Sequence, residues 1–175
     1  QIRLPFQLKG IDPDNGGEFI NWQLFRYCRQ EKIQFTRGRP GKKNDNPYIE
    51  EKNWTHVRKI VGYDRLDTTD ELEALNSLYQ GSLRLYLNFF QPVMKLKEKV
   101  RIGGQLKKKY DTAQTPYQRL LRSRSMGREK KRELTELYLT LNPVRLKREI
   151  EQHLALLRKL VREQKEKRMQ PTRVT

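Results

Sequence analysis

The sequence has few of the residues that form covalent or metal cross-links, with one cysteine and two histidines among 175 residues. Cys28 cannot form a disulfide within the chain, and these three residues do not assemble a zinc-binding spacing. Cys28 lies at helical spacing from Ile20 and Leu24, so we expect it to pack in the core.

Long apolar runs are also missing. No stretch approaches the roughly eighteen apolar residues of a membrane-spanning helix, and the N-terminus lacks the charged and then apolar segments of a secretion signal. We therefore predict a cytoplasmic protein with no membrane partner. Acidic residues are few: 38 Lys and Arg outnumber 21 Asp and Glu, for a net charge of +17. This excess predicts binding to a polyanion, and nucleic acid is the commonest.

The first third of the chain is predicted to alternate strands and helices. A strand is expected near residues 9–12 and another over "IQFTR", residues 33–37. Between them, apolar residues at helical spacing predict a helix over 18–32, capped near Asn15. A further helix should begin at Asn46 and Pro47 and run to about Ile60, with Trp54 in the core.

The remaining residues predict helices on either side of a lysine-rich β unit. One helix is expected over about 70–90, with Leu72 on its apolar side, ended by Pro92. Two short strands are expected around Gly103 and Gly104. Two helices separated by "LNP" follow, and we expect them to pack against each other, although heptad-like spacing from Leu146 onward leaves a partner helix open.

Two acidic residues stand in specific contexts. Asp14 lies in "DPDNGGEF" and Glu50 in "NPYIEEKNW", with 35 residues between them. Each has a simple structural interpretation by itself. Asp-Asn-Gly is typical of a turn, and a Glu in the first turn of a helix interacts favourably with the helix dipole. Their joint spacing and context favour a functional role.

These two sequence segments and their spacing resemble the catalytic core of DDE transposases and retroviral-type integrases, in particular bacterial insertion-sequence transposases. The resemblance extends through "FTRGRPGKKNDNPYIEEKNWTHVR", "LYLNFFQPVMKL" and "TPYQRLL" and covers about residues 4–122. It implies an α/β fold in which residues 1–92 form the C-terminal part of an RNase H-like integrase core. A basic β-rich segment, 93–122, and a helical extension, 123–175, would follow.

The resemblance also implies a chemistry. Asp14 and Glu50 would hold Mg²⁺ or Mn²⁺ in a two-metal site for DNA strand cleavage and transfer. The partners would be the DNA ends of the element and a target DNA, with the intact protein acting as a homo-oligomer. On the helix of Glu50, Asn53, Trp54 and Val57 should turn partly inward, and Glu51 should be exposed.

The chain departs from the family in one respect. The family has three carboxylates, and its first Asp lies several dozen residues before the second, whereas only thirteen residues precede Asp14. The departure implies an N-terminally truncated fragment, incomplete in its metal site and inactive alone. We expect Asp12 to be a surface group and no substitute. A non-catalytic nucleic-acid-binding remnant is the alternative, and an RNA-associated structural protein would explain the charge but not the spacing.

Basic residues near these carboxylates and in the β unit are predicted to contact DNA phosphates, with a solvated surface as the alternative. They are Lys42, Lys43, Lys52, Arg58, Lys59, Lys107, Lys108 and Lys109.

Overall fold

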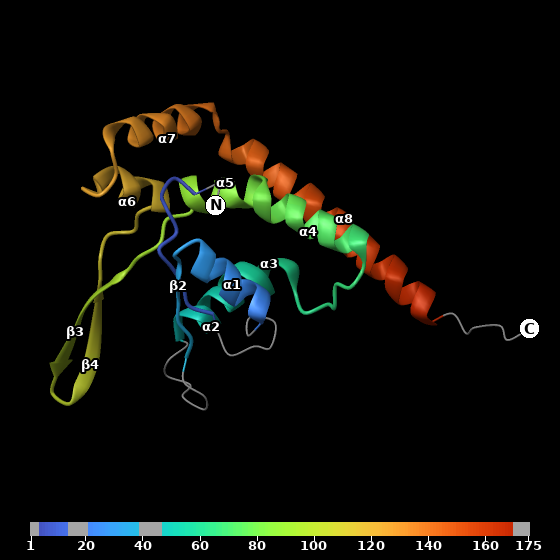
Figure 1. The fold of residues 1–175 in the computed structure, drawn as a ribbon, viewed down its shortest axis with the longest axis horizontal. Coiled ribbons are helices and arrows are strands. Elements are labelled where there is room, and N and C mark those ends of the chain that lie inside the picture. The colour runs from blue at the N-terminus through green and yellow to red at the C-terminus, as the bar shows by residue number, and fades with distance from the viewer. Residues whose placement is uncertain (1–3, 14–20, 39–46, 170–175) are drawn as a thin grey trace, which may run out of the picture. The chain divides into compact units, whose positions relative to one another are not determined.

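The structure is a computed structural model that describes residues 4–13, 21–38 and 47–169 (Figure 1). The described part is mixed α/β and mostly helical, with two small sheets of two strands each. The chain divides into two compact units, unit 1 (Gln1–Asp64) and unit 2 (Arg65–Thr175). No described helix is both long and apolar enough to cross a membrane. The α/β class is confirmed at this coarse level, and an RNase H-like core stays a prediction.

Unit 1 contains a parallel strand pair joined through a helix. β1 (Gly10–Ile11) pairs with β2 (Gln34–Phe35), and α1 (Trp22–Gln30) lies between them in the chain. The predicted helix start was wrong, since Asn21 is extended and its side chain accepts from the Leu24 N–H at 2.7 Å. Asn15 lies outside the described residues. Cys28 is buried, as predicted.

The helix predicted from Pro47 to Ile60 is confirmed and is continuous from residue 47 to 61. It consists of α2 (Pro47–Asn53), a π-helical segment η2 (Trp54–Arg58) and α3 (Lys59–Val61). The expected inward face was wrong, because Asn53, Trp54 and Val57 are all exposed. Helical periodicity tells which residues share a face but does not tell which face meets the core.

Unit 2 is built around a long C-terminal helix. α8 (Pro143–Met169) packs along α4 (Thr69–Gln80) and α5 (Ser82–Phe89), as Figure 1 shows. The single helix predicted over 70–90 is interrupted at Gly81, where an added Cβ would lie 2.8 Å from the Ser77 carbonyl oxygen. Leu72, predicted on the apolar side, is exposed. The buried apolar residues of these three helices are Ala74, Leu78, Leu83, Phe89, Leu146, Ile150, Leu157 and Val161.

The packing of α8 differs from the prediction that it would lie against the preceding helix. α4 and α5 are its main partners, and Arg168 near its end pairs with Asp67 just before α4 at 2.6 Å. The two compact units meet between Asp64 and Arg65, and the predicted segment boundaries at residues 92 and 122 stay predictions. The preceding helix, α7 (Arg128–Thr140), is held by its Tyr138, whose ring stacks on Tyr117 at 4.9 Å.

The predicted β unit is confirmed as a hairpin. β3 (Leu96–Ile102) and β4 (Gln105–Tyr110) are antiparallel, and Ile102 pairs with Gln105 across a two-residue turn. Gly103 and Gly104 both have positive φ, of 55° and 81°, as this tight turn requires. The predicted β-rich segment also contains a helix, α6 (Pro116–Arg122), that sequence reasoning missed.

Candidate functional site

Of the two predicted metal-binding carboxylates, the structure describes Glu50 and does not describe Asp14. Asp14 lies outside the described residues, and Glu50 is exposed in the first turn of α2. Asp12, just after β1, is exposed and accepts a hydrogen bond from the Thr36 hydroxyl at 2.9 Å. Within the described ranges, no three His, Cys, Asp or Glu side chains lie close enough together to hold a metal. The two-metal site therefore stays a prediction.

The helix that carries Glu50 also presents basic side chains. Lys52, Arg58 and Lys59 are exposed, whereas Lys42 and Lys43 lie outside the described residues. The pKa of His56, in the same helix, is lowered by burial and then by the nearby Lys52.

The aromatic neighbours of these cations were missed as a surface feature. The guanidinium carbon of Arg58 lies 4.9 Å from the Tyr63 ring centroid, and Lys59 Nζ lies 5.8 Å from the Trp54 centroid. Alternation of aromatic and basic residues in "NWTHVRKIVGYDR" was the available signal.

The β3–β4 hairpin concentrates positive charge on an exposed element. Residues 95–110 hold seven Lys or Arg and one acidic residue, Glu98, which pairs with Lys109 at 3.4 Å. All of β4 is exposed, and Val100 is the one half-buried residue of β3. In Figure 1 the hairpin extends away from the helices of unit 2. Nearly all of its side chains are therefore accessible to a large ligand.

The hairpin register sets like charges opposite each other. Lys99 pairs directly with Lys108, and Arg101 lies beside them opposite Leu106. Directly opposed residues share a face of the sheet, so three cations gather on one face. Like charges in this position are destabilising, and a bound anion would relieve their repulsion. This placement supports the predicted contact between the β unit and phosphate groups.

An ion pair that was not predicted holds the base of the hairpin. Asp111 accepts from Arg119 Nη1 at 2.6 Å and from the Lys95 backbone N–H at 2.7 Å. Arg119 also donates to the Val93 carbonyl at 2.8 Å. Hydrogen bonds from Arg119, and then from the Lys95 amide, lower the pKa of Asp111 to about 2. These bonds connect α6 to the residues that precede β3 and follow β4 at the base of the hairpin.

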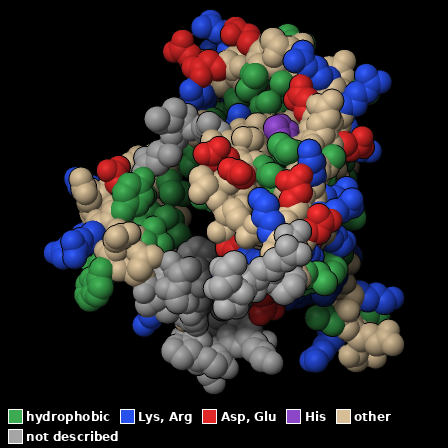
Figure 2. Space-filling view, turned by 90° about the vertical axis from the view of Figure 1, so that its right-hand side faces the viewer, with side chains coloured by type: hydrophobic (Ala, Val, Ile, Leu, Met, Phe, Trp, Pro, Cys, Tyr) green, Lys and Arg blue, Asp and Glu red, His purple; other side chains and the backbone are tan. Residues whose placement is uncertain are grey.

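The helices of unit 2 carry charge in a different way. In the space-filling view, acidic and basic side chains are interspersed over much of the described surface (Figure 2). Several pairs lie three or four residues apart on α7 and α8 and include Lys130–Glu133, Arg132–Glu136, Arg145–Glu149 and Lys159–Glu163. Such mixed surfaces are typical of solvated helices, so the hairpin is the stronger candidate for binding a polyanion.

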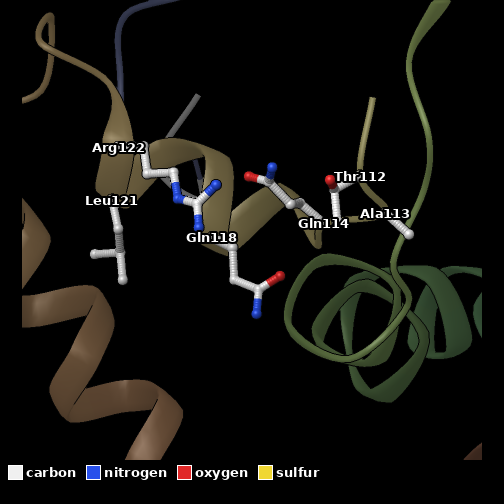
Figure 3. Close-up of a pocket in the computed structure, with 6 residues that line it drawn as sticks. All are labelled: Thr112, Ala113, Gln114, Gln118, Leu121 and Arg122. Carbon is white, nitrogen blue, oxygen red and sulfur yellow. The ribbon is translucent and has the colours of Figure 1, made fainter. Parts of the chain in front are cut away.

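An open hollow of about 450 Å³ lies beside the hairpin base. Figure 3 shows Gln118 and Arg122 from α6 and Gln114 from the preceding loop around it. None of the predicted site residues lines this hollow. Its remaining lining residues are Thr112, Ala113 and Leu121.

Comparison with known proteins finds a relative that matches part of the chain. The chain is 43% identical over 115 residues to the uncharacterized protein y4rM of Sinorhizobium fredii. The alignment covers 66% of this chain and 33% of that protein, so the chain spans about a third of its relative's length. No family model and no solved structure matches the chain.

Proposed function

We propose that the chain is part of a DNA transposase of the integrase type, which cleaves DNA strands and joins them to a target with a divalent metal ion. The placement of Glu50 carries the proposal: it is an exposed carboxylate in the first turn of α2, with 35 residues between it and Asp14. β1 ends at Ile11, three residues before Asp14. The two proposed metal ligands would thus come from the residues just after a strand and from the first turn of a helix.

Glu50 suits a metal-binding role because its carboxylate is accessible and hard cations prefer carboxylate oxygens. The N-terminal turn of the helix also favours the ionised form of this side chain. Mg²⁺ or Mn²⁺ held there with Asp14 would stabilise negative charge on the attacking and leaving oxygens of a phosphodiester.

DNA would be held by basic surfaces that follow this carboxylate in the sequence. Lys52, Arg58 and Lys59 share its helix, and the hairpin adds Lys107 and its neighbours. Lys and Arg contacts to phosphates position a DNA strand without reading its sequence. A two-stranded ribbon also has a width that the major groove of DNA accommodates.

Nucleic-acid binding without catalysis is a second candidate function, and the hairpin favours it. Lys99 and Lys108 repel each other across the hairpin, and a bound phosphate would reduce this repulsion whether or not Asp14 and Glu50 hold a metal. In this case the carboxylates would be relics, and their replacement would leave DNA affinity unchanged or improve it.

The experiment that separates the two candidates measures Mn²⁺ binding by electron paramagnetic resonance, with the chain bound to a short DNA duplex. We expect Asp14→Asn and Glu50→Gln each to reduce the amount of bound Mn²⁺. Glu51→Gln is the matched control, because its carboxylate is exposed one residue further on and points about 100° around the helix. This control should bind as much Mn²⁺ as the wild-type chain.

The outcomes are distinct. Equal Mn²⁺ binding by Glu50→Gln and Glu51→Gln would contradict the metal site, and retained DNA affinity would then favour the non-catalytic candidate. A wild-type chain without affinity for DNA would contradict both.

A further inference from the structure

An aromatic and basic surface lies beyond Glu50 on the same continuous helix. We call it the aromatic–basic patch and define it as Trp54, Arg58, Lys59 and Tyr63. Trp54 is 49% exposed and Tyr63 is 68% exposed. Their ring centroids are 6.5 Å apart, with ring planes inclined at 52°. Two large aromatic rings are thus accessible beside two cations.

The π-helical segment η2 brings one half of the patch together. The Lys59 backbone N–H donates to the Trp54 carbonyl five residues earlier, which widens the turn. The wide turn places Lys59 Nζ 5.8 Å from the centroid of the Trp54 ring. Short π-helical turns within α-helices are frequent at functional sites, and this one begins at Trp54 itself.

The position of Tyr63 in the aromatic–basic patch depends on the glycine that precedes it. Gly62 has a φ of 92°, which ends the helix and redirects the chain. Tyr63 comes back beside the last turns, where the Arg58 guanidinium lies 4.9 Å from its ring centroid. The cation–π contact restrains the ring while leaving most of it open.

The chemistry of the patch matches that of an unpaired nucleotide. Every nucleobase has a π face that stacks on Trp or Tyr, and the adjoining phosphates attract Arg and Lys. In duplex DNA the bases stack on one another, and their faces are unavailable to a protein. An apolar protein partner would instead have to desolvate the cations of Arg58 and Lys59. Charge complementarity therefore favours a single strand of nucleic acid.

We propose that the aromatic–basic patch binds unpaired bases of a DNA strand by stacking them on Trp54 and Tyr63, with Arg58 and Lys59 contacting the adjoining phosphates. The inference rests on the proposed function, in which cleavage releases DNA ends. Trp54 lies four residues, about one helical turn, after Glu50. A frayed strand end held there would lie close to the proposed metal ligand.

The test compares binding of fluorescein-labelled oligothymidine and of a DNA duplex to the full chain by fluorescence anisotropy. Loss of one stacked base costs about 5- to 150-fold in affinity, and we expect Trp54→Ala to weaken oligothymidine binding within this range. Its affinity for the duplex should stay that of the wild-type chain. Trp22→Ala is the matched control, because Trp22 is 74% exposed on α1 and lies outside the patch.

A second measurement covers the case in which Trp54→Ala does not fold. Trp22 and Trp54 are the two tryptophans of the chain, so Trp22→Phe leaves Trp54 as the only indole. Stacked bases quench indole fluorescence, and addition of oligothymidine to Trp22→Phe should quench Trp54. Absence of quenching at saturating oligothymidine would overturn the inference.

The two proposals fail in different ways. No duplex binding by the wild-type chain would contradict the proposed function. Duplex binding together with wild-type affinity of Trp54→Ala for oligothymidine would overturn only the inference. Equal losses of Trp54→Ala on both DNAs would also overturn it, because the patch would then act on phosphates rather than on bases.

Discussion

Glu71 illustrates how one buried carboxylate organises the start of a helix. It is 1% exposed, and its Oε2 accepts from the backbone N–H groups of Asp67 at 2.9 Å and Thr68 at 3.0 Å. The Glu71 N–H donates to the Thr68 hydroxyl in return, which completes a capping box. Burial opposes ionisation, but the hydrogen bonds to the carboxylate outweigh it, and the net pKa of Glu71 is lowered.

Replacement of Glu71 should therefore destabilise unit 2. We expect Glu71→Ala to reduce the free energy of unfolding by about 2–3 kcal/mol, because two hydrogen bonds to a charged acceptor are lost. Urea denaturation followed by circular dichroism measures this change. Glu73→Ala is the control, since Glu73 is exposed on the same helix. Equal stability of the two variants would contradict the capping role.

Single residues were predictable where a local rule decides their environment. Cys28 was correctly placed in the core, because its spacing from apolar neighbours marks one helix face. Trp54 was wrongly placed there, because helix periodicity cannot show which face a neighbouring element covers. The exposure that makes Trp54 a binding candidate therefore became visible only in the structure.

At the scale of elements, the hairpin depends on its base. Almost all of its residues are exposed, and isolated two-stranded hairpins are marginally stable in water. The Asp111 carboxylate connects the Lys95 backbone to Arg119, and Arg119 reaches the Val93 carbonyl. The hydrogen bonds to Asp111 raise the pKa of Arg119 as they lower that of Asp111. This ion pair orients the hairpin relative to α6.

Acidification should break the ion pair between Asp111 and Arg119 only at an unusually low pH. The folded pKa of Asp111 is depressed to about 2, below its ordinary value of 3.8. Its stabilising contribution is therefore fully present above about pH 4 and is lost as the pH falls through about 2. We expect hairpin amide resonances in two-dimensional NMR spectra to keep their native positions at pH 4 and to lose them near pH 2.

Asp111→Asn provides the comparison, because it lacks the charge at every pH. Its hairpin resonances should already be shifted at pH 4 and should move less between pH 4 and pH 2. A wild-type transition centred near pH 4 would contradict the ion pair.

Elements defined by local signals were predictable, and elements defined by distant partners were not. The Gly103-Gly104 pair predicts the hairpin turn, since both positions need positive φ. α6 was missed although Thr115 and Gln118 form a capping box around its start. Contact between Arg119 and Val93 joins residues 26 positions apart, and no local pattern encodes it.

At the scale of the whole molecule, amphipathic helices leave their pairing undetermined. The apolar stripe of α8 predicts that it packs against something, and several helices of the chain offer a suitable face. In the structure it packs on α4 and α5. The candidate metal site rests on the resemblance carried by Asp14 and Glu50 and stays a prediction, because neither composition nor periodicity points to those two carboxylates.

The distribution of charge gives a prediction for the whole chain. Lysines of the hairpin should contact phosphates, whereas Lys159 on α8 pairs with Glu163. Each phosphate contact steepens the dependence of log Kobs on log salt concentration by about 0.9 for duplex DNA. We therefore expect Lys99→Ala and Lys108→Ala each to make the slope shallower by about 0.9, measured by fluorescence anisotropy over a salt series. Lys159→Ala should keep the wild-type slope. Equal slopes for all three variants would mean that the net charge of +17 attracts DNA diffusely and that the hairpin makes no specific contact.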